Sequence, residues 1–181
     1  MDFALSDEQR LLLTTVRRFV DTALRPLEDD VEASGALASE TARAIFAKSK
    51  ALGLYATNIP LEHGGGGLSA IDTMLVEEQF GRTTDILIRR AFGNVYEVLL
   101  HGTPAQHQRW LHPAVRGERI FSVAFTEPNA GSDAAGITTR ASRDGAGWRL
   151  SGGKYFISDA AVSDFFVVSA VTDRAKGAKG I

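Results

Sequence analysis

The stretch FSVAFTEPNAGSD, residues 121–133, joins a run typical of a β-strand to a loop that is broken by proline and glycine. Thr126 lies where the expected strand leaves its sheet, and Pro128 fixes the direction of exit. Gly131 lets backbone amides approach a ligand because it has no Cβ. Exposed N–H groups beside the hydroxyls of Thr126 and Ser132 suit the acceptor edge of a flat heterocycle, or a phosphate. The stretch therefore predicts a cofactor-binding loop.

The same loop carries two carboxylates, Glu127 and Asp133. Their proximity in sequence is compatible with an acid/base pair. The surrounding glycine, proline and small hydroxyls favour a second interpretation, in which both carboxylates accept hydrogen bonds that fix the loop.

The composition bounds the class of protein. The chain has 181 residues, is 44% hydrophobic and carries a formal net charge of -2, which indicates a globular protein and argues against a nucleic-acid or membrane-surface partner. No apolar run approaches the ~20 residues of a membrane span. There is no cysteine, and the histidines lack metal-ligand spacing, so we expect no disulfide and no metal site. These features predict a soluble, cytoplasmic protein.

Helical periodicity dominates residues 1–117. Capping boxes at Ser6 and Thr103, apolar stripes, and glycine or proline stops predict five helices. They are expected at residues 6–26 with a kink or end at Pro26, and at 39–53, 69–81, 85–101 and 103–113, the last stopping at Pro113. Ile45, Phe46 and Leu52 are expected to be buried, and the third helix runs through the apolar residues Ile71, Met74 and Leu75. The glycine run at 63–67 is interpreted as a flexible connection rather than a phosphate cradle, because no Lys-Ser/Thr follows it.

The period becomes closer to two after residue 117. Short runs rich in β-branched and aromatic residues occur at 120–125, 137–143, 148–152, 155–158 and 165–172, with turns at 144–147 and 152–153. The fold class is therefore α+β: an all-α domain at residues 1–117, followed at 118–181 by part of an antiparallel β-sheet or β-barrel domain.

These motifs resemble the acyl-CoA dehydrogenase family. TEPNAGSD followed by GITTRASRDGAGWRLSGGKYFISDA is similar to the family's flavin-binding signature. LGLYATNIPLEHGGGGLS, EEQFGR and HGTPAQHQRWLHPAVRGE resemble, in order, its helical N-terminal domain. The resemblance implies an N-terminal α-domain, a flavin-binding middle β-barrel and a C-terminal four-helix domain. The present sequence would end before that last domain.

The resemblance also implies a set of site residues. The FAD-contacting residues would be Val123, Phe125, Thr126, Gly131, Ser132, Phe156, Ile157 and Ser158. Ser132 would in addition contact the acyl-CoA substrate. The sequence departs from the usual family pattern at Val123, where an aromatic residue is usual, and at FISDA, where the family has Ile-Thr-Asn-Gly after an aromatic residue.

The implied reaction is FAD-dependent α,β-dehydrogenation of an acyl-CoA thioester. The catalytic base is expected beyond residue 181, so the 181-residue segment alone is expected to be inactive. Electron-transfer flavoprotein or a similar acceptor would be the electron partner, and the full-length protein would be a homo-oligomer, a dimer or tetramer. The alternatives are a non-catalytic partner subunit of the same fold and a related flavin oxidase.

Overall fold

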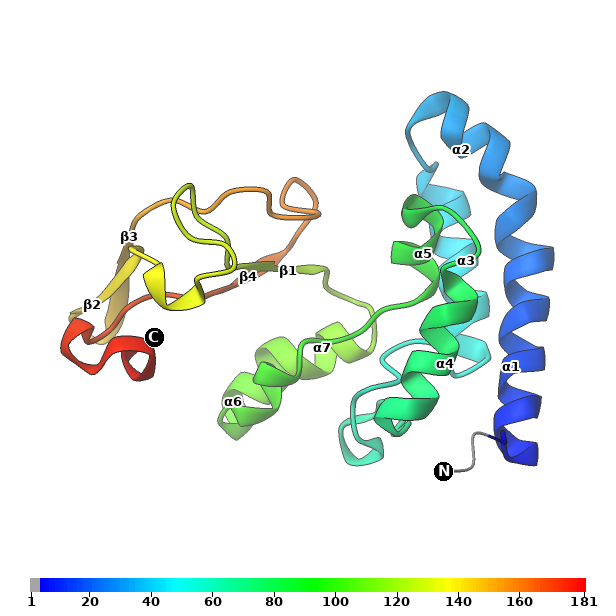
Figure 1. The fold of residues 1–181 in the computed structure, drawn as a ribbon, viewed down its shortest axis with the longest axis horizontal. Coiled ribbons are helices and arrows are strands. Elements are labelled where there is room, and N and C mark those ends of the chain that lie inside the picture. Colours follow the sequence, from blue (N-terminus) through cyan, green and yellow to red (C-terminus); the bar gives the residue numbers. More distant parts are fainter. Residues whose placement is uncertain (1–3) are drawn as a thin grey trace. The chain divides into compact units, whose positions relative to one another are not determined.

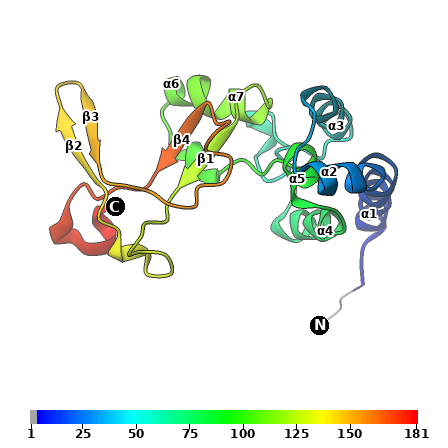
Figure 2. The same cartoon turned by 90° about the horizontal axis from the view of Figure 1, so that it is seen from above.

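The computed structural model of the protein describes residues 4–181, coloured along the chain in Figure 1. The chain divides into two compact units, the first ending at Gly117 and the second running Glu118–Ile181. The first is helical, and the second contains all four strands among the described residues, as Figure 2 also shows. This order confirms the predicted class of fold. Within residues 4–181, no helix is both long enough and apolar enough to cross a membrane.

The helical unit consists of short helices joined by π and 3-10 turns. Its α-helices are α1 Asp7–Phe19, α2 Glu28–Ser34, α3 Ser39–Ala51, α4 Ala70–Phe80, α5 Asp85–Ala91, α6 Pro104–Gln106 and α7 His112–Val115. Its π turns are Val20–Leu24 and His107–Leu111, and its 3-10 turns are Arg25–Leu27, Leu61–His63 and Glu97–His101.

Three of the predicted helix starts are confirmed by their hydrogen bonds. Ser6 Oγ accepts from the Gln9 N–H at 3.1 Å, and Gln9 Oε1 accepts from the Ser6 N–H at 3.0 Å. Thr103 and Gln106 form the same reciprocal box at the start of α6. Ser69 caps α4 through its hydroxyl. Each cap satisfies amides that the first turn of a helix leaves unpaired, typically worth about 1 kcal/mol.

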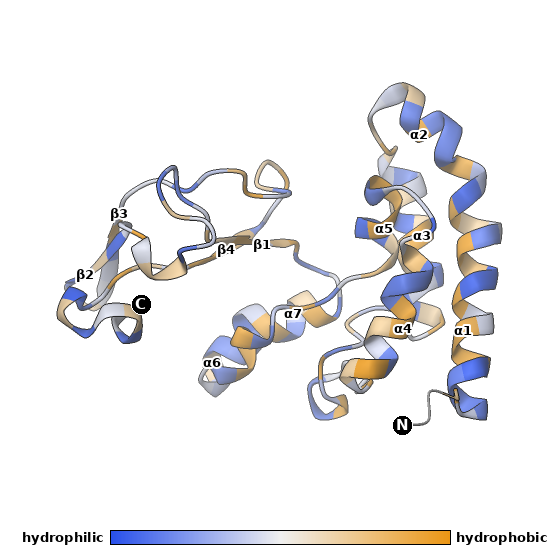
Figure 3. Cartoon of the chain, viewed as in Figure 1, coloured by the Kyte–Doolittle hydropathy of each residue, from blue (hydrophilic) through white to orange (hydrophobic). Residues whose placement is uncertain are grey.

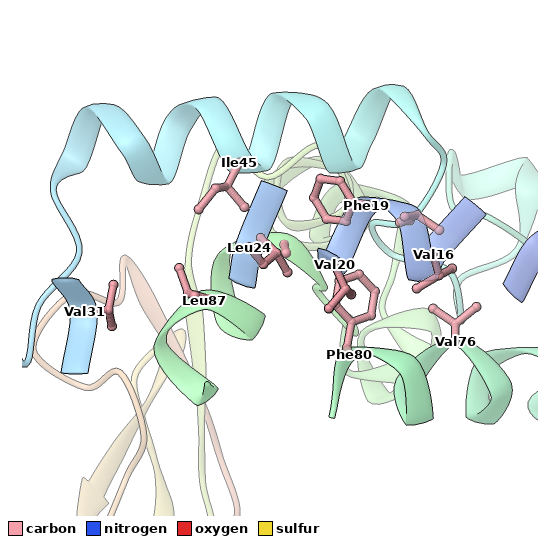
Figure 4. Packing of buried hydrophobic residues seen from close by; sticks show 11 residues of the cluster. Val16, Phe19, Val20, Leu24, Val31, Ile45, Val76, Phe80 and Leu87 are labelled. Atoms are coloured by element: carbon pink, nitrogen blue, oxygen red, sulfur yellow. The ribbon is translucent and has the colours of Figure 1, made fainter. Parts of the chain in front are cut away.

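One hydrophobic cluster fills the helical unit. In Figure 3 hydrophobic and hydrophilic positions alternate around α1, as expected of a helix with one buried face. Figure 4 shows the side chains of that face between those of α3, α4 and α5. Each fully buried aliphatic or phenyl group contributes about 1.5–3 kcal/mol. The cluster comprises Val16, Phe19, Val20, Leu24, Val31, Ile45, Leu54, Val76, Phe80, Leu87 and Ala91.

The predicted core residue Leu52 is exposed instead, as are two apolar residues of the third predicted helix. Leu52 follows the end of α3 and is 46% exposed, and Ile71 and Met74 on α4 are each 66% exposed. The buried face of α4 carries Val76 and Phe80. Apolar residues occur on both sides of α4, so its sequence does not determine which side faces the core.

Two prolines lie within helical segments, and each follows a π turn. Residues 20–24 precede Pro26, and residues 107–111 precede Pro113. In an α-helix the proline ring meets the carbonyl four residues earlier, and the wider π turn displaces those carbonyls. At Pro26 the chain changes its helical turn rather than stopping: α1 ends at Phe19, and helical turns continue through Arg25–Leu27 into α2. The predicted stop at Pro113 is wrong, because helical structure continues through α7.

The helix predicted at 85–101 is also interrupted. It ends at Ala91 in the structure, and the chain is extended before the next 3-10 turn. The cause lies elsewhere in the sequence: the Asn58 amide donates to the Val95 carbonyl at 2.7 Å and accepts from the Val95 N–H at 3.2 Å. The Gly93 carbonyl accepts from the Ala56 N–H at 2.7 Å. These bonds replace the helical ones.

The glycine run is a packed, hydrogen-bonded loop rather than a flexible connection. The amides of residues 64–68 donate to backbone carbonyls of residues 56–61 at 2.9–3.2 Å. A Cβ on Gly65 would collide with the backbone of Ile59. These amides are occupied, so the loop cannot cradle a phosphate in this conformation.

Three half-buried histidines, His63, His107 and His112, form a histidine cluster in the same unit. Their ring centroids are 5.1, 5.7 and 6.1 Å apart. Partial burial, the other two histidines and Arg116 hold the pKa of His112 below its ordinary value. Among residues 4–181, no group of three potential ligands is arranged to hold a metal ion.

The second unit contains two strand pairs. β1 Phe121–Ala124 pairs in parallel with β4 Phe165–Val168, and β2 Arg140–Asp144 forms an antiparallel hairpin with β3 Gly147–Ser151. The 3-10 turns are Ala134–Gly136 and Arg174–Gly180. The expected sheet is antiparallel, and the parallel β1–β4 pair corrects that detail. The β2–β3 hairpin lies between β1 and β4 in the sequence, and the chain runs through β4 in the same direction as through β1.

The strand predicted at residues 155–158 is wrong. Phe156 has φ +55, a left-handed conformation that interrupts an extended chain. The strand predicted at 137–143 begins only at Arg140, because the amides of Thr138 and Thr139 are bonded to a side chain, that of Glu127.

Candidate functional site

Glu127 accepts four hydrogen bonds inside the second unit. Its Oε2 accepts from the Thr138 N–H at 2.7 Å and from the Thr138 hydroxyl at 2.8 Å. Its Oε1 accepts from the Thr139 N–H and from Lys154 Nζ, both at 2.9 Å. The side chain is only 3% exposed. The loop after β1 is therefore fastened to the segment that leads into β2.

Lys154 is the cation of this buried pair. Its side chain is 9% exposed, and Nζ donates to the Phe125 carbonyl at 2.8 Å, to Glu127 at 2.9 Å and to the Ser169 hydroxyl at 3.1 Å. An ammonium group has three donors, and all three are used. Lys154 thus joins the end of β1, the following loop and the chain after β4.

Glu127 is not suited to proton abstraction. Burial by itself would raise the pKa of Glu127, but hydrogen bonds from Thr139, Thr138 and Lys154 outweigh it and hold that pKa well below the usual range. A carboxylate with a low pKa and occupied oxygens is a poor base. Asp133 differs, since its exposed carboxylate accepts no hydrogen bond from the described residues.

The loop after β1 lies beside the segment at residues 155–158. The Tyr155 N–H donates to the Thr126 carbonyl at 2.9 Å. Ser122 precedes the exposed Val123 on β1 and is itself buried. Its hydroxyl donates to the Ser158 carbonyl at 2.5 Å. The two parts of the expected flavin site, 30 residues apart in sequence, are thus held together by hydrogen bonds within one unit.

The residues expected to contact FAD differ in exposure. Gly131, Ser132, Phe156 and Ser158 are exposed, as is Val123 on β1, while Phe125, Thr126 and Ile157 are half-buried. A Cβ on Gly131 would meet no protein atom within 4 Å, so space lies open in front of this backbone. Ser132 lies beside it but is not joined by any hydrogen bond to the 155–158 segment.

Several polar groups at this surface are available to a ligand. Within residues 4–181, the hydroxyls of Thr126, Ser132 and Ser158 and the N–H of Thr126 make no hydrogen bond. The groups behind them, Glu127 and Lys154, are fully paired. Unpaired donors on a backbone that is held by hydrogen bonds suit a ligand with several acceptors.

The aromatic residue at this surface is unusually placed. Phe156 is 92% exposed, and both it and Asp159 adopt positive φ without being glycine. Such conformations cost roughly 1–3 kcal/mol and cluster at functional sites. An exposed phenyl ring, the apolar Val123 side chain and the free Thr126 and Ser158 hydroxyls together fit a planar heterocycle with polar edges, such as a flavin ring.

Two residues of this site were not identified from the sequence. Lys154 lies in GGKYFIS. The signal in the sequence is a lysine among glycines and aromatic residues, whose charge must either be paired inside the fold or reach solvent. Ser122 lies at an inward position of β1, and alternation along the strand could have shown that its hydroxyl needs a partner.

Family models match nearly the whole chain. The model "Acyl-CoA dehydrogenase, N-terminal domain" matches residues 6–118, and "Acyl-CoA dehydrogenase, middle domain" matches residues 122–181. The short-chain-specific acyl-CoA dehydrogenase of Clostridium acetobutylicum is 34% identical over 100% of this chain and 48% of its own length. The chain therefore spans about half the length of that relative.

Solved structures agree with these matches. A glutaryl-coenzyme A dehydrogenase in complex with glutaryl-CoA superposes with a TM-score of 0.84 at 31% identity, covering 99% of this chain and 46% of that one. A glutaryl-CoA dehydrogenase of Mycobacterium smegmatis in complex with FADH2 superposes with a TM-score of 0.78 at 31% identity. The match covers 93% of this chain and 44% of that one.

Proposed function

Because the chain belongs to the acyl-CoA dehydrogenase family, we propose that it forms the flavin-binding part of an FAD-dependent enzyme that dehydrogenates acyl-CoA thioesters. The observation that carries this proposal is the surface at Thr126, Phe156 and Ser158. It combines unpaired donors with an exposed aromatic ring on a backbone fixed by buried hydrogen bonds.

The residues of this surface have distinct proposed roles. The Thr126 N–H and hydroxyl and the Ser158 hydroxyl donate hydrogen bonds to the polar edge of the flavin ring. Phe156, with Ile157, covers the ring and excludes water from it. Val123 and the backbone around Phe125, apart from the Phe125 carbonyl that Lys154 binds, complete the ring contacts.

Gly131 and Ser132 serve the polar part of the ligands. Open space in front of Gly131 leaves room for the FAD pyrophosphate, and the exposed Ser132 hydroxyl is free to contact acyl-CoA.

The reaction removes a proton from the α-carbon and a hydride from the β-carbon of the acyl group. Bound FAD supplies the hydride acceptor. Hydrogen bonds to the thioester oxygen would stabilise the charge that develops as the α-proton leaves. Glu127 is not the base, for the reasons of pairing and pKa given above.

The finer assignments follow from the family resemblance. The domains would be residues 1–117 and 118–181, and the electron acceptor would be electron-transfer flavoprotein or a similar protein. We further propose a homo-oligomer in the cytoplasm, which a chain without cysteine suits.

Anaerobic absorbance spectroscopy of the longest gene product containing this sequence tests the proposal. We expect a bound-flavin spectrum that bleaches when acyl-CoA is added. A protein that purifies and reconstitutes without flavin would support a non-catalytic subunit instead. A flavin that bleaches and recovers rapidly in air alone would support a flavin oxidase.

A further inference from the structure

We propose that the buried Glu127–Lys154 pair is a positioning device, which fixes the direction of the Thr126 amide and joins it to the aromatic segment that follows Lys154. This inference deepens the proposed flavin-binding function and rests on it. The pair would not touch the flavin. It would act through the backbone groups that do.

The first argument comes from the geometry of one peptide unit. The Phe125 carbonyl and the Thr126 N–H belong to the same peptide, and none of the described peptides is cis. In a trans peptide these two groups point in opposite directions. Lys154 Nζ holds the carbonyl inward at 2.8 Å, so the Thr126 N–H must point away from the buried pair.

The second argument comes from chain connectivity. The residue after Lys154 is Tyr155, whose N–H binds the Thr126 carbonyl at 2.9 Å. The next residue is Phe156, the exposed aromatic ring. A single residue, Lys154, therefore sets the position of Thr126 from one side and of Phe156 from the other.

The third argument concerns why the pair is charged. Removing two charges from water is costly, and well-packed apolar side chains often stabilise a fold equally well or better. What the pair adds is direction, because Glu127 and Lys154 together bind Thr138, Thr139 and the Phe125 and Ser169 oxygens at fixed positions. Stability alone does not require this arrangement, whereas a ligand-binding backbone does.

The test separates the position of the Thr126 amide from the stability of the fold. It uses three variants of the longest gene product containing this sequence: Lys154→Met, Glu127→Gln and the double variant. Lys176→Met is the matched control, since Lys176 lies in the same unit and forms an exposed ion pair with Asp173 at 3.3 Å. For each protein, two quantities are measured: thermal unfolding of the apo form and the dissociation constant for FAD by titration.

We expect each single variant to raise the FAD dissociation constant at least about tenfold, about 1.4 kcal/mol. In the double variant no unpaired charge remains buried, so apo stability should recover at least in part, while FAD binding stays at least about tenfold weaker. In the apo state, the Tyr155 amide should exchange its hydrogen faster in Lys154→Met than in the wild type. Lys176→Met should match the wild type throughout.

Two results would overturn the inference. One is a folded Lys154→Met protein that binds FAD as tightly as the wild type. The other is a double variant in which FAD affinity recovers together with stability, which would make the pair a stabilising element only. A wild-type protein that binds no FAD would instead refute the proposed function, so the two failures are distinguishable.

Discussion

The hydrogen bond from Ser122 to Ser158 predicts a specific cost for Ser122→Ala. The Ser122 side chain is buried, and its hydroxyl donates its only proton to the Ser158 carbonyl at 2.5 Å. Ser163 bonds the same hydroxyl at 2.6 Å but can turn to the Asp159 carbonyl at 3.0 Å, so it loses little. Both hydrogen bonds of the Ser122 hydroxyl are lost, and because only Ser163 has another partner, the Ser158 carbonyl is left unpaired, which we expect to cost about 1–2 kcal/mol.

The same change should weaken flavin binding, because the bond anchors the segment that carries Phe156 and Ser158. If the whole cost falls on the bound conformation, the FAD dissociation constant rises about 5- to 30-fold. Urea unfolding and FAD titration measure the two effects, with Ser142→Ala on the exposed face of β2 as the control. A Ser122→Ala protein indistinguishable from Ser142→Ala in both measurements would refute the reasoning.

Further predictions concern both units. Thr126→Val and Ser158→Ala each remove one donor to the flavin, worth about 0.5–1.5 kcal/mol, and should shift its affinity and reduction potential; two variants that behave as wild type would disprove the assignment. Gly93→Ala places a Cβ against the Tyr55 ring and should cost about 1–3 kcal/mol in urea unfolding, whereas an unchanged midpoint would contradict this packing. The pKa of His112 is lower in the fold than its ordinary 6.5, so the unfolded chain binds the proton more readily. The stability of the helical unit should thus be complete above pH 6.5 and decline as pH falls below it; equal urea midpoints at about pH 7.5 and about pH 5.5 would contradict the shift.

The sequence was most informative where structure is determined locally. The capping boxes at Ser6 and Thr103 depend on residues three positions apart, and both form as predicted. The interruption after Ala91 depends on Asn58, more than 30 positions away, so helical periodicity could not reveal it. Pro113 shows a third case, in which a helix breaker is accommodated by a change in helical turn.

The site shows the same division. Loop chemistry and family resemblance led to Thr126 and Ser158, and the structure holds their two segments side by side. The role of Lys154 was missed, because its three acceptors come from parts of the chain that only the fold brings together. The parallel pairing of β1 and β4 was missed for the same reason, since alternation in a strand does not specify the direction of its partner.

A crystal structure of the FAD complex of the longest gene product containing this sequence would test the central claim most directly. The account predicts the flavin ring within hydrogen-bonding distance of Thr126 and Ser158, with Phe156 against the ring and the Glu127–Lys154 pair unchanged behind it. A flavin bound elsewhere, with the Thr126 and Ser158 hydroxyls still facing solvent, would contradict the account.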